Sequence, residues 1–215
     1  MKEAPCVSLA VLAKAPIPGL AKTRLIPALG AAGAARLQRH FTQRTLRTAL
    51  RSGLGPVSLW CAPQVRHRFF QALRRSGGPL ALHAQPEGDL GLRMLTALRA
   101  GCTHGPTVLM GTDCPALSTA DLQAAAQALH DGADVVCQPA EDGGYVLIGM
   151  RQPQPTLFTD MPWSTAEVMT QTRARAQAAG LRLHELPPLW DVDNPEDLPR
   201  WHTFFESETT CNDVC

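Results

Sequence analysis

The chain has 215 residues, of which 45% are hydrophobic, so it is long enough and apolar enough to build one domain with a full core. Its formal net charge of +1 and its 5% of aromatic residues supply neither the basic field nor the stacking surface of a nucleic-acid binder. Its 7 scattered cysteines include no C-x-x-C pair, which argues against a disulfide scaffold and a zinc module. Any bound anion must therefore be held by a local cluster of charge.

We expect no targeting signal at the N-terminus. The first apolar run, Val7 to Ala13, is too short for a secretory signal or a membrane span, and no later segment reaches membrane length. We therefore expect a cytoplasmic protein without membrane or nucleic-acid partners. Residues 1–206 are predicted to form one domain and 207–215 a disordered tail. Cys211 and Cys215 lie in that tail one helical turn apart, and their role stays open.

Apolar runs typical of strands alternate with segments of helical periodicity. The predicted strands are 7–13, 57–61, 80–83, 107–110, 134–137, 145–148 and 181–186. The predicted helices are 31–50, 64–75, 90–100, 120–130, one that opens on a capping box at 164–167 and runs to 179, and a terminal one that begins at Pro195. This alternation predicts an α/β fold, a single-domain and mostly parallel sheet flanked by helices on both faces. Ligands bind beyond the carboxyl ends of such strands, so the loops that follow strands are the candidate sites.

The loop after the first strand, residues 14–25, holds two of the three lysines in the chain. Two prolines stiffen it, one glycine relaxes it, and Lys14, Lys22, Thr23 and Arg24 carry its polar groups. Lysine offers a compact charge to phosphate and arginine a planar fork, so the loop is a candidate anion cradle for a nucleotide. The glycines of a P-loop or of a dinucleotide fingerprint are missing. The alternative is a solvated surface loop.

A second loop follows the apolar strand 107–110 and reads Gly111-Thr112-Asp113-Cys114-Pro115. Asp113 should lie at the carboxyl edge of the sheet, where a hard cation can bridge it to phosphate oxygens. The alternative is an aspartate that caps a helix or closes an Asx-turn. Cys114 reads as a packed side chain, because no histidine stands near it in sequence.

A third loop, Glu141-Asp142-Gly143-Gly144, joins two predicted strands. Its glycines allow a ligand to approach the backbone closely beside Asp142. The same residues also suit an ordinary tight turn, because Asp-Gly is a common hairpin signal. The two interpretations are evenly matched.

A fourth loop, residues 191–197, carries Asp191 and Asp193 at alternate positions. In extended chain both carboxylates project to the same side, where they repel each other unless a cation lies between them. The alternative is that Asp193 or Asn194 caps the helix that begins at Pro195. Both can hold at once, with one residue capping and the other binding a cation.

A weaker feature is the turn that enters the predicted helix at residue 90. It contains Gly91 and Arg93, and its backbone N–H groups can receive an anion or a base edge. A simple entry from loop to helix explains the same residues equally well.

Six motifs in a fixed order together resemble a known family. They are K-A-P-I-P-G-L-A-K-T-R-L, G-D-L-G-L-R-M, G-T-D-C-P-A-L, D-G-G-Y-V-L-I-G, P-W-S-T and D-V-D-N-P-E-D-L. The set is similar to that of the radical-SAM/selenodomain-associated transferase 1 proteins of bacteria, also described as glycosyltransferases of arsenosugar biosynthesis, which belong to the nucleotide-diphospho-sugar transferase (GT-A) superfamily. More distantly, the chain resembles 2-phospholactate and molybdenum-cofactor guanylyltransferases.

The resemblance implies a GT-A fold, a nucleotide donor, a small-molecule acceptor and Mg²⁺ or Mn²⁺. It implies that Lys22 and Arg24, with Lys14, hold the donor phosphates. Asp113 would bind the metal, with Asp191 or Asp193 supplying a second carboxylate, and Asp142 would face the acceptor. Trp163 is a candidate wall of the acceptor pocket or a simple packing residue.

Three functions are compatible with these residues. The first is a metal-dependent transferase that moves a sugar from a nucleotide-diphosphate donor to a small acceptor. The second is a nucleotidyltransferase, in which a phosphorylated or acidic small molecule attacks a nucleoside triphosphate. The third is a nucleotide-binding protein without catalysis, which the number of carboxylates at predicted strand ends disfavours, because a pure binder has less need of a divalent cation.

Overall fold

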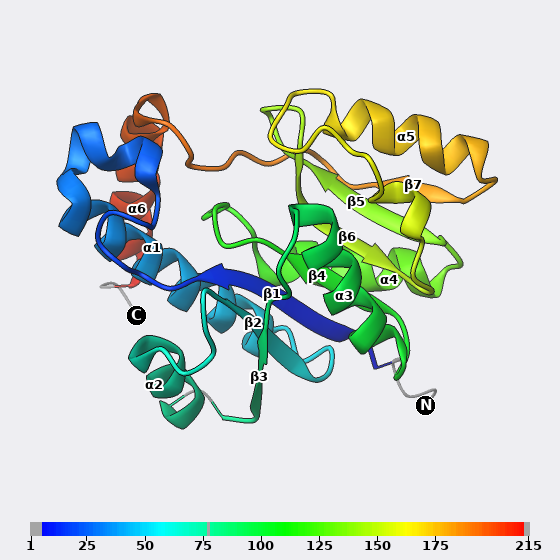
Figure 1. Cartoon of the computed structure of the whole chain (residues 1–215), viewed down its shortest axis with the longest axis horizontal. Helices are drawn as coiled ribbons and strands as arrows, with labels where there is room; N and C mark the ends of the chain where they lie inside the picture. The colour runs from blue at the N-terminus through cyan, green and yellow to red at the C-terminus, as the bar shows by residue number, and fades with distance from the viewer. Residues whose placement is uncertain (1–5, 77, 213–215) are drawn as a thin grey trace.

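The computed structural model describes residues 6–76 and 78–212, and a seven-stranded sheet runs through its centre (Figure 1). The strands are β1 (Ser8–Lys14), β2 (Val57–Ala62), β3 (Leu80–Ala84), β4 (Thr107–Met110), β5 (Val135–Pro139), β6 (Tyr145–Met150) and β7 (Leu183–Glu185). Their spatial order is β3-β2-β1-β4-β6-β5-β7. Only β6 runs antiparallel to its neighbours, so the predicted mostly parallel sheet is confirmed.

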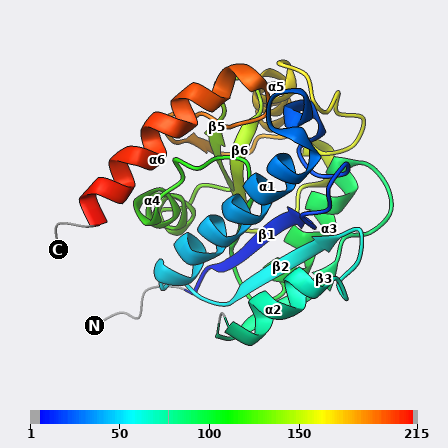
Figure 2. The same ribbon diagram turned by 90° about the vertical axis from the view of Figure 1, so that its left-hand side faces the viewer.

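Helices cover both faces of this sheet. They are α1 (Ile26–Arg51), α2 (Arg68–Ser76), α3 (Leu90–Cys102), α4 (Thr119–His130), α5 (Val168–Ala178) and α6 (Leu198–Asn212), with short 3₁₀ turns at Thr23–Leu25, Pro155–Leu157 and Pro195–Asp197. Alternate residues of β1 show the division: Leu9 and Val11 pack with α1, α2 and α4, whereas Ala10 packs with α3 and α5. Figure 2 looks onto the α1 side. No helix in the described ranges is long and apolar enough to cross a membrane.

A third apolar cluster joins α6 to the beginning of α1. Phe41 of α1 meets Trp201 of α6 edge to face, with ring centroids 4.9 Å apart, and Val192 is buried in the same cluster. This packing matters for function because it places the segment before α6 against the loop before α1. Residues 191–193 and Lys22, far apart in sequence, are thereby held close to one another.

Two segments differ from their predicted local structure. The predicted capping box at 164–167 is wrong: α5 begins at Val168, Ser164 has a left-handed backbone with φ 66°, and no side chain caps the helix. The predicted tail from 207 is helical as far as Asn212, within α6. The side chain of Cys211 and all of Cys215 lie outside the described residues.

Candidate functional site

The four loops selected from the sequence meet at the carboxyl edge of the sheet. The loops after β1 and β4 lie there because these strands are parallel. The turn between β5 and β6 lies there too, since β5 runs parallel to β4 and the hairpin leaves its carboxyl end. The chain after β7 continues along this edge, where Leu189 pairs with Ala140. The topology therefore brings residues from both ends of the chain to one place, as expected for an α/β sheet.

Lys22 lies at the centre of this meeting point. Its side chain is only 4% exposed, and its Nζ is 2.6 Å from Asp113 Oδ1 and 3.0 Å from Asp193 Oδ1. The same Nζ donates to the carbonyl oxygen of Val192 at 2.5 Å. An ammonium has three N–H donors, so protein oxygens already occupy all of them. In this structure Lys22 therefore bridges carboxylates, and has no donor left for a phosphate.

Two carboxylates keep this buried lysine charged. Burial by itself lowers the pKa of Lys22, but the charges of Asp113 and Asp193 and the hydrogen bonds to them outweigh it, so that its pKa is raised. The backbone of Lys22 is left-handed, with φ 48° and ψ 48°. This conformation is unfavourable for a residue with a Cβ and is kept only where the surroundings hold it. The three contacts of the ammonium supply that hold.

Backbone and side-chain hydrogen bonds fix the two acidic segments beside Lys22. The amide of Val192 donates to the carbonyl oxygen of Asp113 at 2.9 Å, which ties the two segments together directly. Farther on, the carboxylate of Asp197 accepts the backbone N–H groups of Asp193 and Asn194 at 2.9 and 2.8 Å. Asp197 thus orders the turn before α6 and leaves the side chain of Asp193 to face Lys22.

A cavity of about 260 Å³ opens beside this bridge. Its lining is Arg24, Glu141, Asp142, Trp190, Asp191, Asp193, Asn194, Asp197 and Arg200. Asp191 and Asp193 both face it, in line with their alternate spacing. Burial is the largest cause that raises the pKa of Asp191 to about 7; the charges of Asp142, Asp193 and Asp113 add to it, and Lys22 opposes it. The cavity therefore has more negative charge than one ammonium balances.

The oxygen-rich lining fits a divalent cation held jointly with a ligand. Carboxylate and carbonyl oxygens are the ligands that Mg²⁺ and Mn²⁺ prefer, and the lining carries five carboxylates against two guanidinium groups. Within residues 6–76 and 78–212, no three His, Cys, Asp or Glu side chains are grouped so as to hold a metal ion by themselves. A metal here needs further oxygens, and phosphates can provide them.

Asp142 projects from the hairpin turn between β5 and β6. Its Oδ1 accepts the N–H of Gly144 at 2.9 Å, and the exposed side chain lines the acidic cavity. Gly143 has φ +92°, and a Cβ there would overlap the backbone of Ala166. Both interpretations of the sequence therefore apply: the segment is a tight hairpin turn, and it also forms part of the cavity wall.

The remaining predicted residues lie at different distances from the ion pairs that Lys22 forms with Asp113 and Asp193. Arg24 is 60% exposed, with Nη1 at 3.7 Å from Asp193 Oδ2. Lys14 ends β1 and is exposed, as is Thr23. Gly91 is buried against Phe158 and Trp163, where a Cβ would come within 2.9 Å of Trp163 Nε1. Arg93 has a buried Nε with no hydrogen-bond partner, and neither it nor Gly91 lines the cavity.

The sequence analysis gave no ligand-binding role to five residues of the cavity wall, which are Glu141, Trp190, Asn194, Asp197 and Arg200. Glu141 and Arg200 form a two-point ion pair, with N–O distances of 2.6 and 3.1 Å, and Arg200 also lies 4.7 Å from the ring centroid of Trp190. No local signal predicts a pair 59 residues apart. Asp197 had a signal, because acidic residues in the first turn of a helix commonly accept backbone N–H groups.

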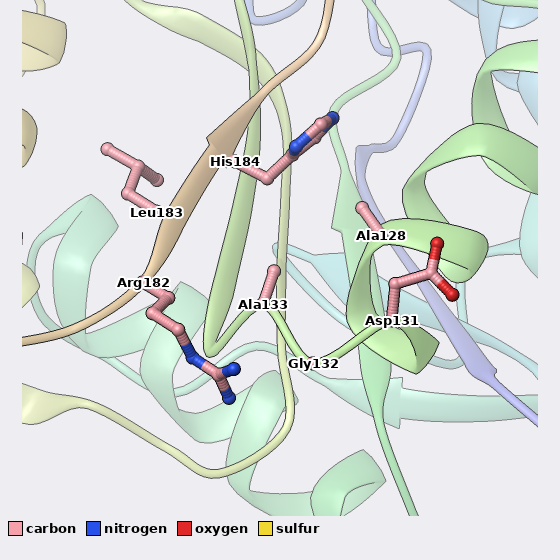
Figure 3. Close-up of a pocket in the computed structure, with 7 residues that line it drawn as sticks. All are labelled: Ala128, Asp131, Gly132, Ala133, Arg182, Leu183 and His184. Atoms are coloured by element: carbon pink, nitrogen blue, oxygen red, sulfur yellow. The ribbon is translucent and has the colours of Figure 1, made fainter.

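A second hollow, of about 270 Å³, lies at the amino edge of the sheet (Figure 3). Asp131, Arg182 and His184 provide its polar side chains, from the end of α4 and from the beginning of β7. Arg182 pairs with Asp134 at 3.4 Å. Because β5 and β7 begin here, this hollow is at the opposite edge from Lys22 and shares no residue with the acidic cavity.

Comparison with known families agrees with this architecture. Residues 45–165 match the family described as "Uncharacterized protein conserved in bacteria (DUF2064)". The chain belongs to the DUF2064 family. A crystal structure of a "putative nucleotide-diphospho-sugar transferase" from Desulfovibrio desulfuricans G20 is 31% identical to this DUF2064 protein, with a TM-score of 0.80 over 88% of this chain and 83% of that one. None of the curated proteins matches the chain.

More distant structures share the fold of this DUF2064 protein. CMP:2-keto-3-deoxy-manno-octonic acid synthetase complexed with CTP is 15% identical, with a TM-score of 0.58 over 94% of this chain and 99% of that one. The 4-diphosphocytidyl-2C-methyl-D-erythritol synthase of Anaerococcus prevotii DSM 20548 is 11% identical, with a TM-score of 0.62 over 93% and 96%. At these identities the likeness concerns the fold alone.

Proposed function

We propose that this DUF2064 protein is a metal-dependent transferase that uses a nucleotide-diphosphate-activated donor and transfers a sugar to a small acceptor. The supporting observation is that carboxylate oxygens of Asp113, from the middle of the chain, and Asp193, from near its end, lie within 3.0 Å of the Nζ of Lys22. Transferases of this class need cations and carboxylates together at the donor diphosphate. The resemblance to the glycosyltransferases of arsenosugar biosynthesis supports sugar as the group transferred.

Each residue of the site has a part in this proposal. Asp113 and Asp193, with Asp191 nearby, hold Mg²⁺ or Mn²⁺, which when bound supplies positive charge to the diphosphate leaving group. Arg24 and Lys14 are exposed, and we assign them to the donor phosphates. Asp142 borders the cavity and takes the proton of the acceptor group.

A thermal-shift panel tests donor binding. Sugar nucleotides and nucleoside triphosphates are added to the protein with Mg²⁺, with Mn²⁺ and with a chelator. A donor well above its dissociation constant should stabilise the fold by about 2–4 kcal/mol, and only when the metal is present. Binding without metal dependence and without turnover would indicate a nucleotide-binding protein instead, and would refute the transferase.

Product analysis separates glycosyl from nucleotidyl transfer. Release of a nucleoside diphosphate from a sugar nucleotide supports the proposed function. Release of pyrophosphate from a triphosphate in the presence of a phosphorylated or acidic acceptor supports a guanylyltransferase-like enzyme. We favour the first because of the resemblance to the glycosyltransferases of arsenosugar biosynthesis and the 31% identity with a "putative nucleotide-diphospho-sugar transferase".

A further inference from the structure

We propose that Lys22 is a built-in placeholder for the divalent cation: its ammonium holds the metal-binding oxygens together until the metal arrives, and is then released toward the donor phosphates. This inference rests on the proposed function, since it concerns the same site. Its first support is that Asp113, Asp193 and the carbonyl of Val192 place three oxygens at 2.5 to 3.0 Å around one cationic nitrogen.

These three oxygens are the kind that a hard cation binds, and they converge on a point that is already occupied by positive charge. An ammonium and a divalent cation cannot both occupy that point, because like charges at such a distance repel strongly in a buried setting. Metal binding at Asp113 and Asp193 therefore requires the Nζ of Lys22 to leave. Its three N–H donors are then available, and a phosphate beside the metal is an acceptor for them.

The position of Lys22 also explains how the site stays ordered without metal. Asp113 and Asp193 come from segments 80 residues apart in numbering, and with Asp142 and Asp191 they form one acidic group. Without a cation these carboxylates would repel one another. The buried ammonium of Lys22 supplies one positive charge between Asp113 and Asp193. A divalent ion supplies more charge, so it can compete with Lys22 for the same oxygens.

The decisive experiment measures Mn²⁺ binding in the absence of nucleotide, by electron paramagnetic resonance, for wild type, Lys22→Met and Lys14→Met. Lys14 is exposed and has no ion pair in the described residues, so its variant reports the general effect of removing one positive charge near the site. We expect Lys22→Met to bind Mn²⁺ at least tenfold more tightly than wild type, and Lys14→Met to stay within about twofold of it. An affinity in Lys22→Met equal to or weaker than that of wild type overturns the inference.

A second measurement uses only the wild-type protein, in case Lys22→Met does not fold. Lysines are acetylated briefly with and without a saturating concentration of Mn²⁺, and the modification of Lys22 is compared with that of Lys14 by mass spectrometry. Released Lys22 should react at least fivefold faster with Mn²⁺, while Lys14 should react at the same rate. A rate for Lys22 that Mn²⁺ leaves unchanged refutes the placeholder.

These outcomes are separate from the test of the proposed function. If metal promotes donor binding to wild type but Lys22→Met gains no affinity for Mn²⁺, only the placeholder fails. If metal never promotes donor binding, the transferase itself fails, whatever Lys22 does.

Discussion

Two sets of ion pairs join distant segments at the carboxyl edge of the sheet, and they differ in their exposure. Lys22 lies between Asp113 and Asp193 with a side chain that is 4% exposed, and all its donors are used. Arg200 and Glu141 pair just as closely, at 2.6 Å, but their side chains are 52% and 53% exposed. Asp113 and Asp193 are 44% and 35% exposed, so water reaches the carboxylate side of the first set, but it screens the second pair from both sides. Distance alone therefore does not indicate which contact the fold depends on.

The largest effect should come from removing the buried charge. Lys22→Met leaves Asp113 and Asp193 facing each other without a cation. We expect a cost of about 3 kcal/mol of unfolding free energy, the low end for a buried pair, because the two carboxylates are 44% and 35% exposed. Urea denaturation at pH 7 with a chelator measures this loss. Lys14→Met is the matched control and should change stability by less than about 0.5 kcal/mol. A loss below about 1 kcal/mol in Lys22→Met would mean that its ion pairs stabilise the fold no more than the exposed pair of Glu141 and Arg200 does.

The next effect concerns activity. Asp113→Ala removes a carboxylate from both Lys22 and the metal, so metal-dependent donor binding should disappear and transfer should slow about a hundredfold or more, roughly 2.7 kcal/mol in the barrier. Calorimetric titration of the nucleotide with Mg²⁺, followed by a turnover assay, measures both. Asp134→Asn, at the amino edge of the sheet, is the control and should leave them unchanged. Unaltered nucleotide affinity in Asp113→Ala would remove the metal from the proposal.

The fold could be predicted because its signals are local. The apolar run of Thr107–Met110 and the periodicity of α3 and α4 each lie within one segment, and the rule for parallel sheets then places the loops at one edge. The same rule correctly grouped Lys22, Asp113 and Asp193, although it could not give their distances. The capping box at 164–167 failed because tertiary contacts override it: Gly143 accepts the N–H of Met169, and α5 begins later.

The state of Lys22 could not be predicted, because it depends on three partners that the sequence does not connect. Residue types suggested a lysine that binds phosphate, whereas burial and the carbonyl of Val192 show an ammonium with no free donor. The ion pair of Glu141 and Arg200 could not be predicted either, because its two residues lie 59 positions apart in the sequence. Local patterns predict which edge a side chain reaches, but the partner that it meets there is decided by packing.

A pH-dependent effect of intermediate size should come from Asp191. Its pKa of about 7, against 3.8 for an ordinary aspartate, means that the folded state holds this proton more tightly than the unfolded state. Stability should therefore fall as pH rises from about 4 to about 7, and the full penalty should remain above pH 7. Asp191→Asn removes the penalty and should be more stable than wild type by about 1–2 kcal/mol at pH 8, after allowance for partial solvent screening.

Urea denaturation of both proteins at several pH values between 4 and 8 tests this expectation. The difference between them should shrink as pH falls and vanish near pH 4, where wild-type Asp191 is protonated in the folded state and is becoming so in the unfolded state. Parallel curves for the two proteins over this range would show that neither burial nor the neighbouring carboxylates raise the pKa of Asp191.

The smallest effect should come from the exposed pair, and it completes the comparison. A double-mutant cycle of Glu141→Gln and Arg200→Met should give a coupling energy of about 0.5 kcal/mol, because both side chains are half exposed. The coupling should weaken further in high salt. Arg200→Met should cost more than Glu141→Gln, since Arg200 also lies over the ring of Trp190 at 4.7 Å. A cycle of Lys22→Met and Asp193→Asn should give at least about 1 kcal/mol and respond less to salt, because Lys22 is buried while Asp193 is 35% exposed. Equal coupling energies in the two cycles would mean that burial does not distinguish these contacts, and the special role of Lys22 would then have no energetic basis.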